Sequence, residues 1–267
     1  MQIVTSIQTA TKQYNTGDRP ILVLCNDYCE YVCKLALGGN GMKLMCEYLS
    51  ASFLRIWGLP VPDFKFVKLS YDHVQQYNIP KHIVERTCFG SKYNRSCVEL
   101  SFFNDDPDLK KQKAYKDNRD QLLKIALFDL WLANEDRNFN NTNLLIDVAA
   151  NYQFIPIDHG SIFNSCEFSG DISLLTENES LTGVKLFKSL FHNTDFTLEY
   201  IKELKEYFYL CTHNCKKQVH DILNEIPPDW KQCLPKVEQK LNNEVFTTDW
   251  ECSVFSTLLK NVDSLYQ

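Results

Sequence analysis

Carboxylate and amide side chains gather in two short polar segments of the sequence. Asp136, Asn141 and Asn143 lie in the segment NEDRNFNNTNLLID, and Asp158 lies in the segment FIPIDHG. Carboxylate and amide oxygens are the ligands that Mg²⁺ prefers, and sites that handle nucleotide phosphates hold this ion with few protein groups. Asp136 could accept the proton of an attacking hydroxyl while Asp158 and one asparagine hold the metal. A five-residue spacing lets a short loop turn Asp136 and Asn141 toward one point.

Two asparagines compete for the role of metal ligand. Asn143 precedes the apolar pair Leu144-Leu145 and is predicted to begin a strand, where side chains alternate between two faces. Asn141 is predicted to lie in the loop, free to turn inward. We therefore expect Asn141, rather than Asn143, to supply the amide oxygen.

The same residues also fit a simpler interpretation. Asn and Asp favour turns because their side chains bond the local backbone, so the segment 136–143 could be only a polar loop. Asp158, before His159 and Gly160, could equally form a turn or a cap. His159 follows Asp158 directly and does not face a Ser or Cys, so a nucleophile triad is hard to build and a structural hydrogen bond is expected.

A lysine and a glutamate in the first half of the chain favour the chemical interpretation. Lys34 lies in the apolar strand-like stretch YVCKLAL, and Glu47 follows thirteen residues later, near the apolar stripe of a predicted helix. A strand lysine paired with a helix glutamate can hold a cation over nucleotide phosphates. The alternative is an ordinary surface lysine and an exposed helix glutamate.

Glycines give a weaker signal for phosphate binding. The pattern GxGxxG is missing, and the turn formed by Gly17, Asp18, Arg19 and Pro20 contains one glycine. The segment 38–41, GGNG, opens a predicted helix and could present backbone N–H groups to a phosphate. Either segment could also be a plain connection.

The elements that position these residues change character along the chain. Residues 5–37 are predicted to form two or three antiparallel strands, residues 42–57 a helix, and residues 61–69, 83–89 and 98–103 further strands. The acidic segment 104–107, NDDP, then leads to a predicted helix at 117–134 and a hairpin of strands at 143–147 and 152–157. Beyond residue 181 the spacing is helical, with interruptions at Pro227-Pro228 and Pro235.

This layout predicts an α+β fold of two lobes. Residues 1–103 form a β-rich lobe with one helix, and residues 104–267 form a helical lobe that contains the polar segments and the hairpin. A cleft between two such lobes is a natural place for a ligand.

Composition excludes several classes of protein. The chain has 267 residues, 34 acidic and 28 basic, with a formal net charge of -6, so a sequence-independent nucleic-acid binder is not expected. Apolar runs fall far short of the roughly 20 residues that cross a bilayer. The amino-terminal residues lack a basic and then apolar leader, which favours a reducing cytoplasmic location for the eleven cysteines.

Two cysteine clusters have spacings that a metal could use. Cys25, Cys29 and Cys33 recur every four residues, and Cys211, His213 and Cys215 lie close in sequence. The first cluster spans two predicted strands and a turn, which would point its sulfurs in different directions. We interpret both clusters as buried or incidental thiols, because free Cys behaves as a small apolar side chain.

Taken together, four sequence strings identify a family resemblance. YVCKLALGGNGMKLMCEYLSASFLRIWGLPVP, CFGSKY, FDLWLANEDRNFNNTNLL and IPIDHG resemble the HipA-like kinases, specifically the compact subgroup with a single catalytic core. The resemblance runs over residues 17–159, with looser agreement through IPPDW at 226–230. Asn138 and Thr142 depart from it, since the family resemblance leads us to expect a small residue such as Thr and a Pro there.

The resemblance implies a two-lobed protein-kinase-like fold that transfers the γ-phosphoryl group of ATP to a Ser or Thr hydroxyl. By position, Lys34 resembles the phosphate-contacting lysine and Glu47 its helix partner. Asp136 resembles the catalytic base, Asn141 the loop ligand of Mg²⁺ and Asp158 the second metal ligand.

The family resemblance also implies a loop and a partner. Gly17, Asp18, Arg19 and Pro20 look like the phosphate-covering loop, and family members often work beside a DNA-binding antitoxin. Three functions remain open at this stage. The first is a protein kinase acting on an unknown protein, the second is a small-molecule phosphotransferase, and the third is a non-catalytic nucleotide-binding or interaction module.

Overall fold

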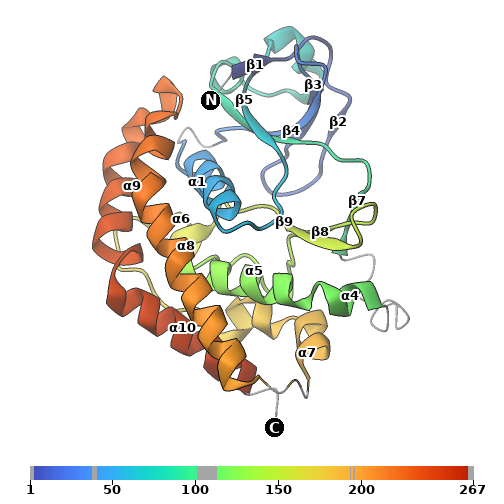
Figure 1. The fold of residues 1–267 in the computed structure, drawn as a ribbon. Helices are drawn as coiled ribbons and strands as arrows, with labels where there is room; N and C mark the ends of the chain where they lie inside the picture. Colours follow the sequence, from blue (N-terminus) through green and yellow to red (C-terminus); the bar gives the residue numbers. More distant parts are fainter. Residues whose placement is uncertain (1–2, 38–40, 101–112, 193, 195, 264–267) are drawn as a thin grey trace.

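The computed structural model describes residues 3–37, 41–100, 113–192, 194 and 196–263, which form a β-rich lobe above a helical lobe in the view of Figure 1. A mixed sheet of six strands makes up most of the upper lobe. Its strands in sequence order are β1 (Ile3–Thr5), β2 (Lys12–Gln13), β3 (Ile21–Leu24), β4 (Glu30–Lys34), β5 (Phe64–Lys68) and β6 (Cys88–Lys92).

The order of the strands in space places Lys34 in the middle of this sheet. The order is β1-β5-β6-β4-β3-β2, and only β1 and β5 pair in parallel among these neighbours. β3 and β4 form a hairpin, and Lys34 at the end of β4 lies opposite Phe89 of β6. β4 has neighbours on both sides, β3 as far as Cys33 and β6 as far as Lys34, which fixes the direction in which the strand leads to Lys34.

A smaller sheet lies between the two lobes. It contains β7 (Cys97–Glu99), β8 (Leu144–Asp147) and β9 (Gln153–Pro156), all antiparallel to their neighbours. β7 follows the six-stranded sheet in sequence, whereas β8 and β9 belong to the second half of the chain. This pairing joins the two halves at the level of the polar segments.

Helices make up most of the remaining chain. One helix, α1 (Met42–Ile56), lies against the six-stranded sheet, the short helix α2 (Lys81–Val84) packs in the upper lobe, and the remaining helices build the lower lobe (Figure 1). The other α-helices are α4 (Lys113–Asp117), α5 (Arg119–Trp131), α6 (Ile162–Cys166), α7 (Lys185–Phe191), α8 (Leu198–Asn224), α9 (Leu234–Lys240) and α10 (Thr248–Asp263). Short 3-10 turns are η1 (Tyr71–His73), η2 (Gln75–Tyr77), η4 (Glu177–Glu179), η5 (Leu181–Gly183) and η6 (Pro228–Cys233), and a π-helical turn is η7 (Leu241–Val245).

Helix α1 is buried on nearly every side. The residues predicted to form its apolar face, Met45, Leu49, Phe53 and Trp57, are all at most 2% exposed. The opposite side is buried as well, because the sheet covers one face and α8 packs on another. Burial on both sides carries Glu47, which is 4% exposed, into the interior.

The large core extends from the six-stranded sheet into the helical lobe. It joins α1, β5 and β6 to α5, α8 and α10, and a second, smaller cluster lies on the far side of the sheet. Aromatic rings connect the parts, for example Trp57 stacked on Trp131 with centroids 5.5 Å apart. The larger core therefore spans both lobes, and the smaller cluster belongs to the β-rich lobe alone.

The α+β, two-lobed architecture confirms the predicted fold class, with differences at particular elements. The expected strand at 83–89 is wrong in its first half, because Ile83 and Val84 belong to α2, which begins directly after Pro80. Pro235 does not interrupt the helical region. It lies in the first turn of α9, where a missing N–H costs nothing.

Several predicted boundaries shift or fall elsewhere. The helix expected at 117–134 ends at Trp131, and Ala133 adopts a left-handed φ of 48° directly after it. The strand expected to begin at Asn143 begins at Leu144. The boundary between 103 and 104, the segment 104–107 and residues 38–40 of the second glycine segment lie outside the described residues.

Candidate active site

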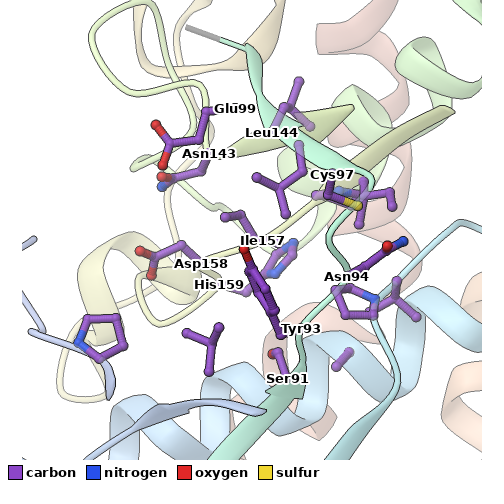
Figure 2. Close-up of a pocket in the computed structure, with 18 of the residues that line it drawn as sticks. Ser91, Tyr93, Asn94, Cys97, Glu99, Asn143, Leu144, Ile157, Asp158 and His159 are labelled. Carbon is purple, nitrogen blue, oxygen red and sulfur yellow. The ribbon is translucent and has the colours of Figure 1, made fainter. Parts of the chain in front are cut away.

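A cleft of about 1190 Å³ separates the six-stranded sheet from the smaller sheet. Figure 2 shows Asn143, Asp158 and His159 around this cleft together with Ser91, Tyr93 and Asn94 from the end of β6 and the residues after it. Lys34, Glu47 and Asn141 also line it. The cleft thus brings together predicted site residues from both halves of the chain.

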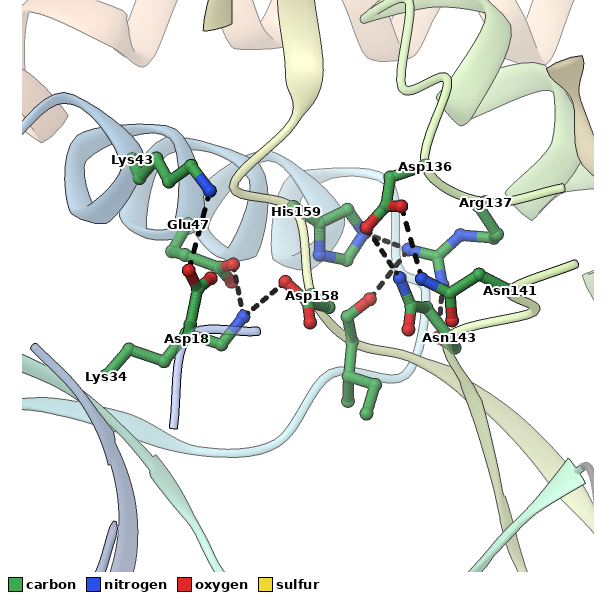
Figure 3. A network of polar contacts seen from close by, with 11 residues as sticks. Asp18, Lys34, Lys43, Glu47, Asp136, Arg137, Asn141, Asn143, Asp158 and His159 are labelled. Carbon is green, nitrogen blue, oxygen red and sulfur yellow. Dashed lines mark hydrogen bonds and ion pairs between the residues drawn. The ribbon is translucent and has the colours of Figure 1, made fainter. Parts of the chain in front are cut away.

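Lys34 bridges two carboxylates at one end of the cleft (Figure 3). Its Nζ lies 2.5 Å from Glu47 Oε1 and 2.6 Å from Asp158 Oδ1. The lysine side chain is 14% exposed and the glutamate side chain 5%, so water screens this pair weakly. The structure therefore brings the predicted lysine and glutamate together and adds Asp158 as a third member.

Burial and charge act against each other in this cluster. Burial disfavours the charge on Lys34, but the carboxylates of Glu47 and Asp158 outweigh it and raise the lysine pKa. Burial raises the pKa of Glu47, against the opposing effect of Lys34. Burial also opposes the charge of Asp158, but Lys34 outweighs it and the pKa of Asp158 is lowered. The lowered pKa of Asp158 favours the charged form of this carboxylate, which is the form that binds a cation.

The backbone after Asp158 approaches Glu47 closely. Asp158 has a left-handed φ of 60°, and the backbone N–H of His159 donates to the Glu47 carboxylate. A Cβ on Gly160 would lie 3.3 Å from Glu47 Oε1 and 3.7 Å from Lys43 Cβ. Glycine at 160 lets the segment pack against α1 without displacing the glutamate.

Asp136 lies in the loop between α5 and β8, in contact with the cleft-lining residues Asn141 and Asn143. Asn141 Nδ2 donates to its Oδ1 and Asn143 Nδ2 donates to its Oδ2, each at 3.2 Å. Both asparagines therefore use their amide nitrogens on Asp136, which leaves both amide oxygens available as acceptors. Asn143 has a left-handed φ of 43° and lies just before β8, so the expected strand constraint on its side chain is wrong.

Arg137 is a residue of this site that the sequence analysis missed. Its side chain is fully buried and forms an ion pair with Asp129 of α5, with Nε 2.7 Å from Oδ2. Its other nitrogens donate to the carbonyl oxygens of Asn143 and Ile157 and, at 2.8 Å, to His159 Nε2. Figure 3 shows this guanidinium behind the asparagines and Asp136.

One feature of the sequence could have indicated the buried network around Arg137. Asp129 interrupts the apolar run LFDLWL on α5, and a buried carboxylate needs a buried cation partner. His159 has the expected structural hydrogen bond, to Arg137. Burial and the nearby charges of Arg137 and Lys34 hold its pKa well below the usual range, so the ring is neutral and accepts from the arginine.

The first glycine segment lies at the edge of the site, and Gly41 is the described residue of the second. Thr16 and Pro20 line the cleft, whereas Gly17, Asp18 and Arg19 stand beside it, and Asp18 lies 3.4 Å from Lys43 of α1. In the second segment, Gly41 packs on the Trp230 ring, which a Cβ would approach to 3.3 Å. The lack of a side chain at Gly41 thus allows close contact with Trp230 of the helical lobe.

The cysteines are free thiols throughout the described chain. Cys25, Cys33, Cys211 and Cys215 are buried in apolar surroundings, and Cys29 is half-buried. Within the described residues, no three side chains of His, Cys, Asp or Glu come together in a way that could hold a metal ion. Nor does any helix in those residues have the length and apolar character to span a membrane.

A family model described as HipA-like kinase matches residues 4–252 of the sequence. The chain belongs to the HipA-like kinase family. It is accordingly a kinase-like protein, and the family supports phosphotransferase activity in general terms. A comparison with curated proteins finds none that matches.

A solved kinase structure shares the fold. The crystal structure of the proinflammatory kinase CtkA from Helicobacter pylori is similar over 99% of this chain and 99% of its own, with a TM-score of 0.56 and 13% identity. At that identity the similarity shows the fold alone. WaaP, solved in complex with acyl carrier protein, is similar over 98% of this chain and 90% of its own, with 12% identity and a TM-score of 0.38, too low to argue from.

Proposed function

We propose that this HipA-like kinase is an ATP- and Mg²⁺-dependent serine/threonine protein kinase, which transfers the γ-phosphoryl group of ATP to a protein hydroxyl. The observation that carries the proposal is the contact of Lys34 with both Glu47 and Asp158 at the cleft. A buried cation between a helix glutamate and the aspartate of a following loop suits the binding of nucleotide phosphates.

The walls of the cleft suit the rest of a nucleotide. Val32 and Phe89 line it from the six-stranded sheet, and Ile155 and Ile157 line it from the other side. An apolar slot with charged groups at one end matches a flat base attached to phosphates. We propose Gly17, Asp18 and Arg19 as the loop that covers the phosphates, with Asp18 next to Lys43 of α1.

The donor set of the site fits Mg²⁺. Asp158 offers a carboxylate with a lowered pKa, and the asparagines that donate to Asp136 keep their amide oxygens free. We propose that Asp158 and Asn141 hold the ion. Mg²⁺ held there would supply positive charge that offsets the negative charge developing on the phosphates during transfer.

Asp136 is proposed as the catalytic base. It is half-buried beside the cleft-lining Asn141 and Asn143, and each of its oxygens accepts one amide N–H, which orients the carboxylate and leaves lone pairs for a substrate hydroxyl. Glu47 would hold Lys34 in place during the reaction, and Arg137 would hold the loop that carries Asp136.

The division of labour follows the two halves of the chain. We propose that residues 1–103 bind the nucleotide phosphates and that residues 104–267 supply the catalytic loop and the metal site. The same proposal includes a protein substrate and an antitoxin-like partner of the kind found beside family members.

Incubation with radiolabelled ATP, Mg²⁺ and a panel of proteins tests the proposal. The wild type should label itself or a substrate on Ser or Thr, and Asp136→Asn should reduce labelling by about 100-fold or more while ATP binding persists, because a base contributes little to ground-state binding. Asp221→Asn, an exposed change on α8, is the matched control and should label normally. Labelling of small molecules alone, or unchanged labelling by Asp136→Asn, would contradict the proposal.

A further inference from the structure

Two cysteines meet beside the candidate active site without taking part in the proposed reaction. Cys46 precedes Glu47 on α1, and its Sγ lies 3.6 Å from Sγ of Cys166, at the end of α6. Cys46 is buried and Cys166 is half-buried. The two residues are 120 positions apart in sequence, so the fold alone brings the sulfurs together.

The segment that carries Cys166 connects to both parts of the site. It begins just after Gly160, and the backbone N–H of Phe163 donates to the Leu132 carbonyl at 2.7 Å. The backbone N–H of Asn164 donates to the Ala133 carbonyl at 3.0 Å. The segment thus braces the start of the loop that leads to Asp136.

The backbone of this segment is unusual. Phe163, Asn164, Ser165 and Cys166 all have left-handed φ values, between 51° and 66°. Residues other than glycine rarely adopt this conformation, because the side chain then crowds the backbone. The segment therefore stores strain at the point where it presents Cys166 to α1.

We propose that Cys46 and Cys166 are a redox modification site, at which a peroxide oxidises the two thiols to a reversible disulfide between helix α1 and the segment after Gly160. The reaction proceeds in two steps. The Cys166 thiolate attacks one peroxide oxygen, the O–O bond breaks, and water leaves after protonation, so that Cys166 becomes a sulfenic acid. The Cys46 thiol then attacks the Cys166 sulfur, the S–O bond breaks, and a second water leaves. In total two thiols lose two electrons and two protons, and one hydrogen peroxide is reduced to two waters.

The environments of the two sulfurs indicate which cysteine is oxidised first and which one then attacks it. The hydrogen bond from Cys46 lowers the pKa of Cys166, burial opposes this effect, and the nearby ammonium of Lys43 supports it. Burial raises the pKa of Cys46 well above its usual value. A more acidic and accessible thiol next to a buried one is the arrangement of an oxidised cysteine and its resolving partner.

Cys233 is a nearby alternative partner, but its sulfur is already engaged. It is buried at the end of η6 and accepts a hydrogen bond from the backbone N–H of Gly41. Within the described chain its sulfur interacts electrostatically with both thiols but forms no hydrogen bond with either, in contrast to the 3.6 Å contact between Cys46 and Cys166. The geometry favours the Cys46–Cys166 pair.

Disulfide formation would move the segment after Gly160. The sulfurs must approach to about 2.05 Å, a movement of about 1.5 Å. Helix α1 is buried along most of its length, so the half-buried Cys166 segment is the part that moves. This consequence rests on the proposed function: a displacement on the order of 1 Å can lower a reaction rate about 100-fold. Phosphoryl transfer should therefore fall on oxidation and recover on reduction.

Peptide mapping of the whole, folded protein tests the disulfide without any assay of activity. The reduced protein is treated with hydrogen peroxide, free thiols are alkylated, and the digest is examined by mass spectrometry without reduction. A peptide linking Cys46 to Cys166 should dominate and should disappear after dithiothreitol. In Cys46→Ser, Cys166 should instead accumulate as a sulfenic acid that dimedone traps.

Matched variants separate the pair from general oxidation. Cys252 is exposed on α10, so Cys252→Ser should form the disulfide at the wild-type rate. Cys166→Ser should leave Cys46 unmodified, and its circular dichroism melt shows whether it folds. Absence of the Cys46–Cys166 peptide while Cys166 is oxidised, or a dominant link to Cys233, would overturn the inference.

The activity arm distinguishes the two proposals. Phosphoryl transfer by the wild type should fall after peroxide and return after dithiothreitol, whereas transfer by Cys166→Ser should not respond to peroxide. If the disulfide forms but the reduced protein transfers no phosphoryl group, the proposed function fails and the modification site stands. If the reduced protein is active and no disulfide forms, the modification site fails and the proposed function stands.

Discussion

Arg137 shows how much of the site depends on one buried side chain. Its guanidinium contacts Asp129 of α5, the carbonyl of Asn143 before β8, the carbonyl of Ile157 after β9, and the His159 ring. These partners lie in three separate segments. A planar guanidinium with five N–H donors can serve them at once, which lysine cannot do. The loop of Asp136 and the segment of Asp158 are thereby held in one arrangement.

The neutral His159 ring gives the protein a predictable pH dependence. In the unfolded chain the ring has its usual pKa of about 6.5, and in the folded protein burial with Arg137 and Lys34 depresses that pKa strongly. Below about pH 6.5 the unfolded state binds a proton that the folded state does not. The neutral His159 ring therefore contributes fully to the free energy of unfolding above this pH. Below it, the free energy of unfolding falls by about 1.4 kcal/mol per pH unit.

Urea unfolding of His159→Gln measures this contribution. Glutamine can accept from Arg137 but does not titrate, so the loss of stability between about pH 7.5 and about pH 5.5 should be smaller than in the wild type. His213→Gln, an exposed change on α8, should keep the wild-type slope. Equal slopes for wild type and His159→Gln would show that the ring is not held neutral.

Asn141 and Asn143 can be separated by their dependence on Mg²⁺. The Asn143 carbonyl accepts from Arg137, which anchors its backbone, whereas Asn141 is exposed in the loop and free to turn its amide oxygen toward a cation. Asn141→Ala should raise the Mg²⁺ concentration for half-maximal activity by about tenfold, equivalent to about 1.4 kcal/mol. Asn143→Ala should instead lower the thermal stability of the protein. A shifted Mg²⁺ requirement in Asn143→Ala alone would reverse the assignment.

At the scale of elements, the packing of α1 against the segment 158–160 decides whether Lys34 and Glu47 stay paired. Gly160→Ala would place a Cβ 3.3 Å from Glu47 Oε1, closer than most such contacts. The glutamate must then shift, and we expect ATP affinity to fall by about tenfold. Isothermal titration with Mg-ATP measures the change.

Gly170→Ala is the matched control for this change. The nearest atom to its added Cβ is Glu167 Cγ at 3.9 Å, an ordinary contact. Its ATP affinity should equal that of the wild type. Wild-type affinity in Gly160→Ala would mean that the Glu47 carboxylate has room to move without losing Lys34.

Local patterns in the sequence predict the elements but not the long-range contacts. The four-residue period of Met45, Leu49, Phe53 and Trp57 predicts α1 and the face that it buries. Strand and helix spacing likewise predicts the pairing of Lys34 with Glu47. The contacts of Arg137 could not be predicted, because they depend on the paths of three segments that meet only after folding. The contact of Cys46 with Cys166 escapes prediction for the same reason.

At the scale of the whole molecule, the helical lobe and the six-stranded sheet are also joined away from the cleft. Asp229 of η6 accepts from the backbone N–H and the hydroxyl of Thr87, both at 2.8 Å, and Trp230 donates to the Thr87 carbonyl at 3.1 Å. Trp230 also packs edge-on against Phe66 of β5. With a core that spans both lobes, these contacts make the chain one cooperative unit, which should unfold in a single transition.

Mg-ATP should therefore stabilise the whole chain. A ligand at 100 times its dissociation constant adds about 2.7 kcal/mol to the folded state, which for a chain of this size corresponds to roughly 5 °C or more in the melting temperature. Lys34→Ala should reduce this shift, because the cation between Glu47 and Asp158 is lost, whereas Lys260→Ala, an exposed change on α10, should keep it. Differential scanning calorimetry distinguishes the outcomes: one transition that moves as a unit supports nucleotide binding at the shared cleft. A melting temperature that millimolar Mg-ATP leaves unchanged would remove the basis of the kinase proposal.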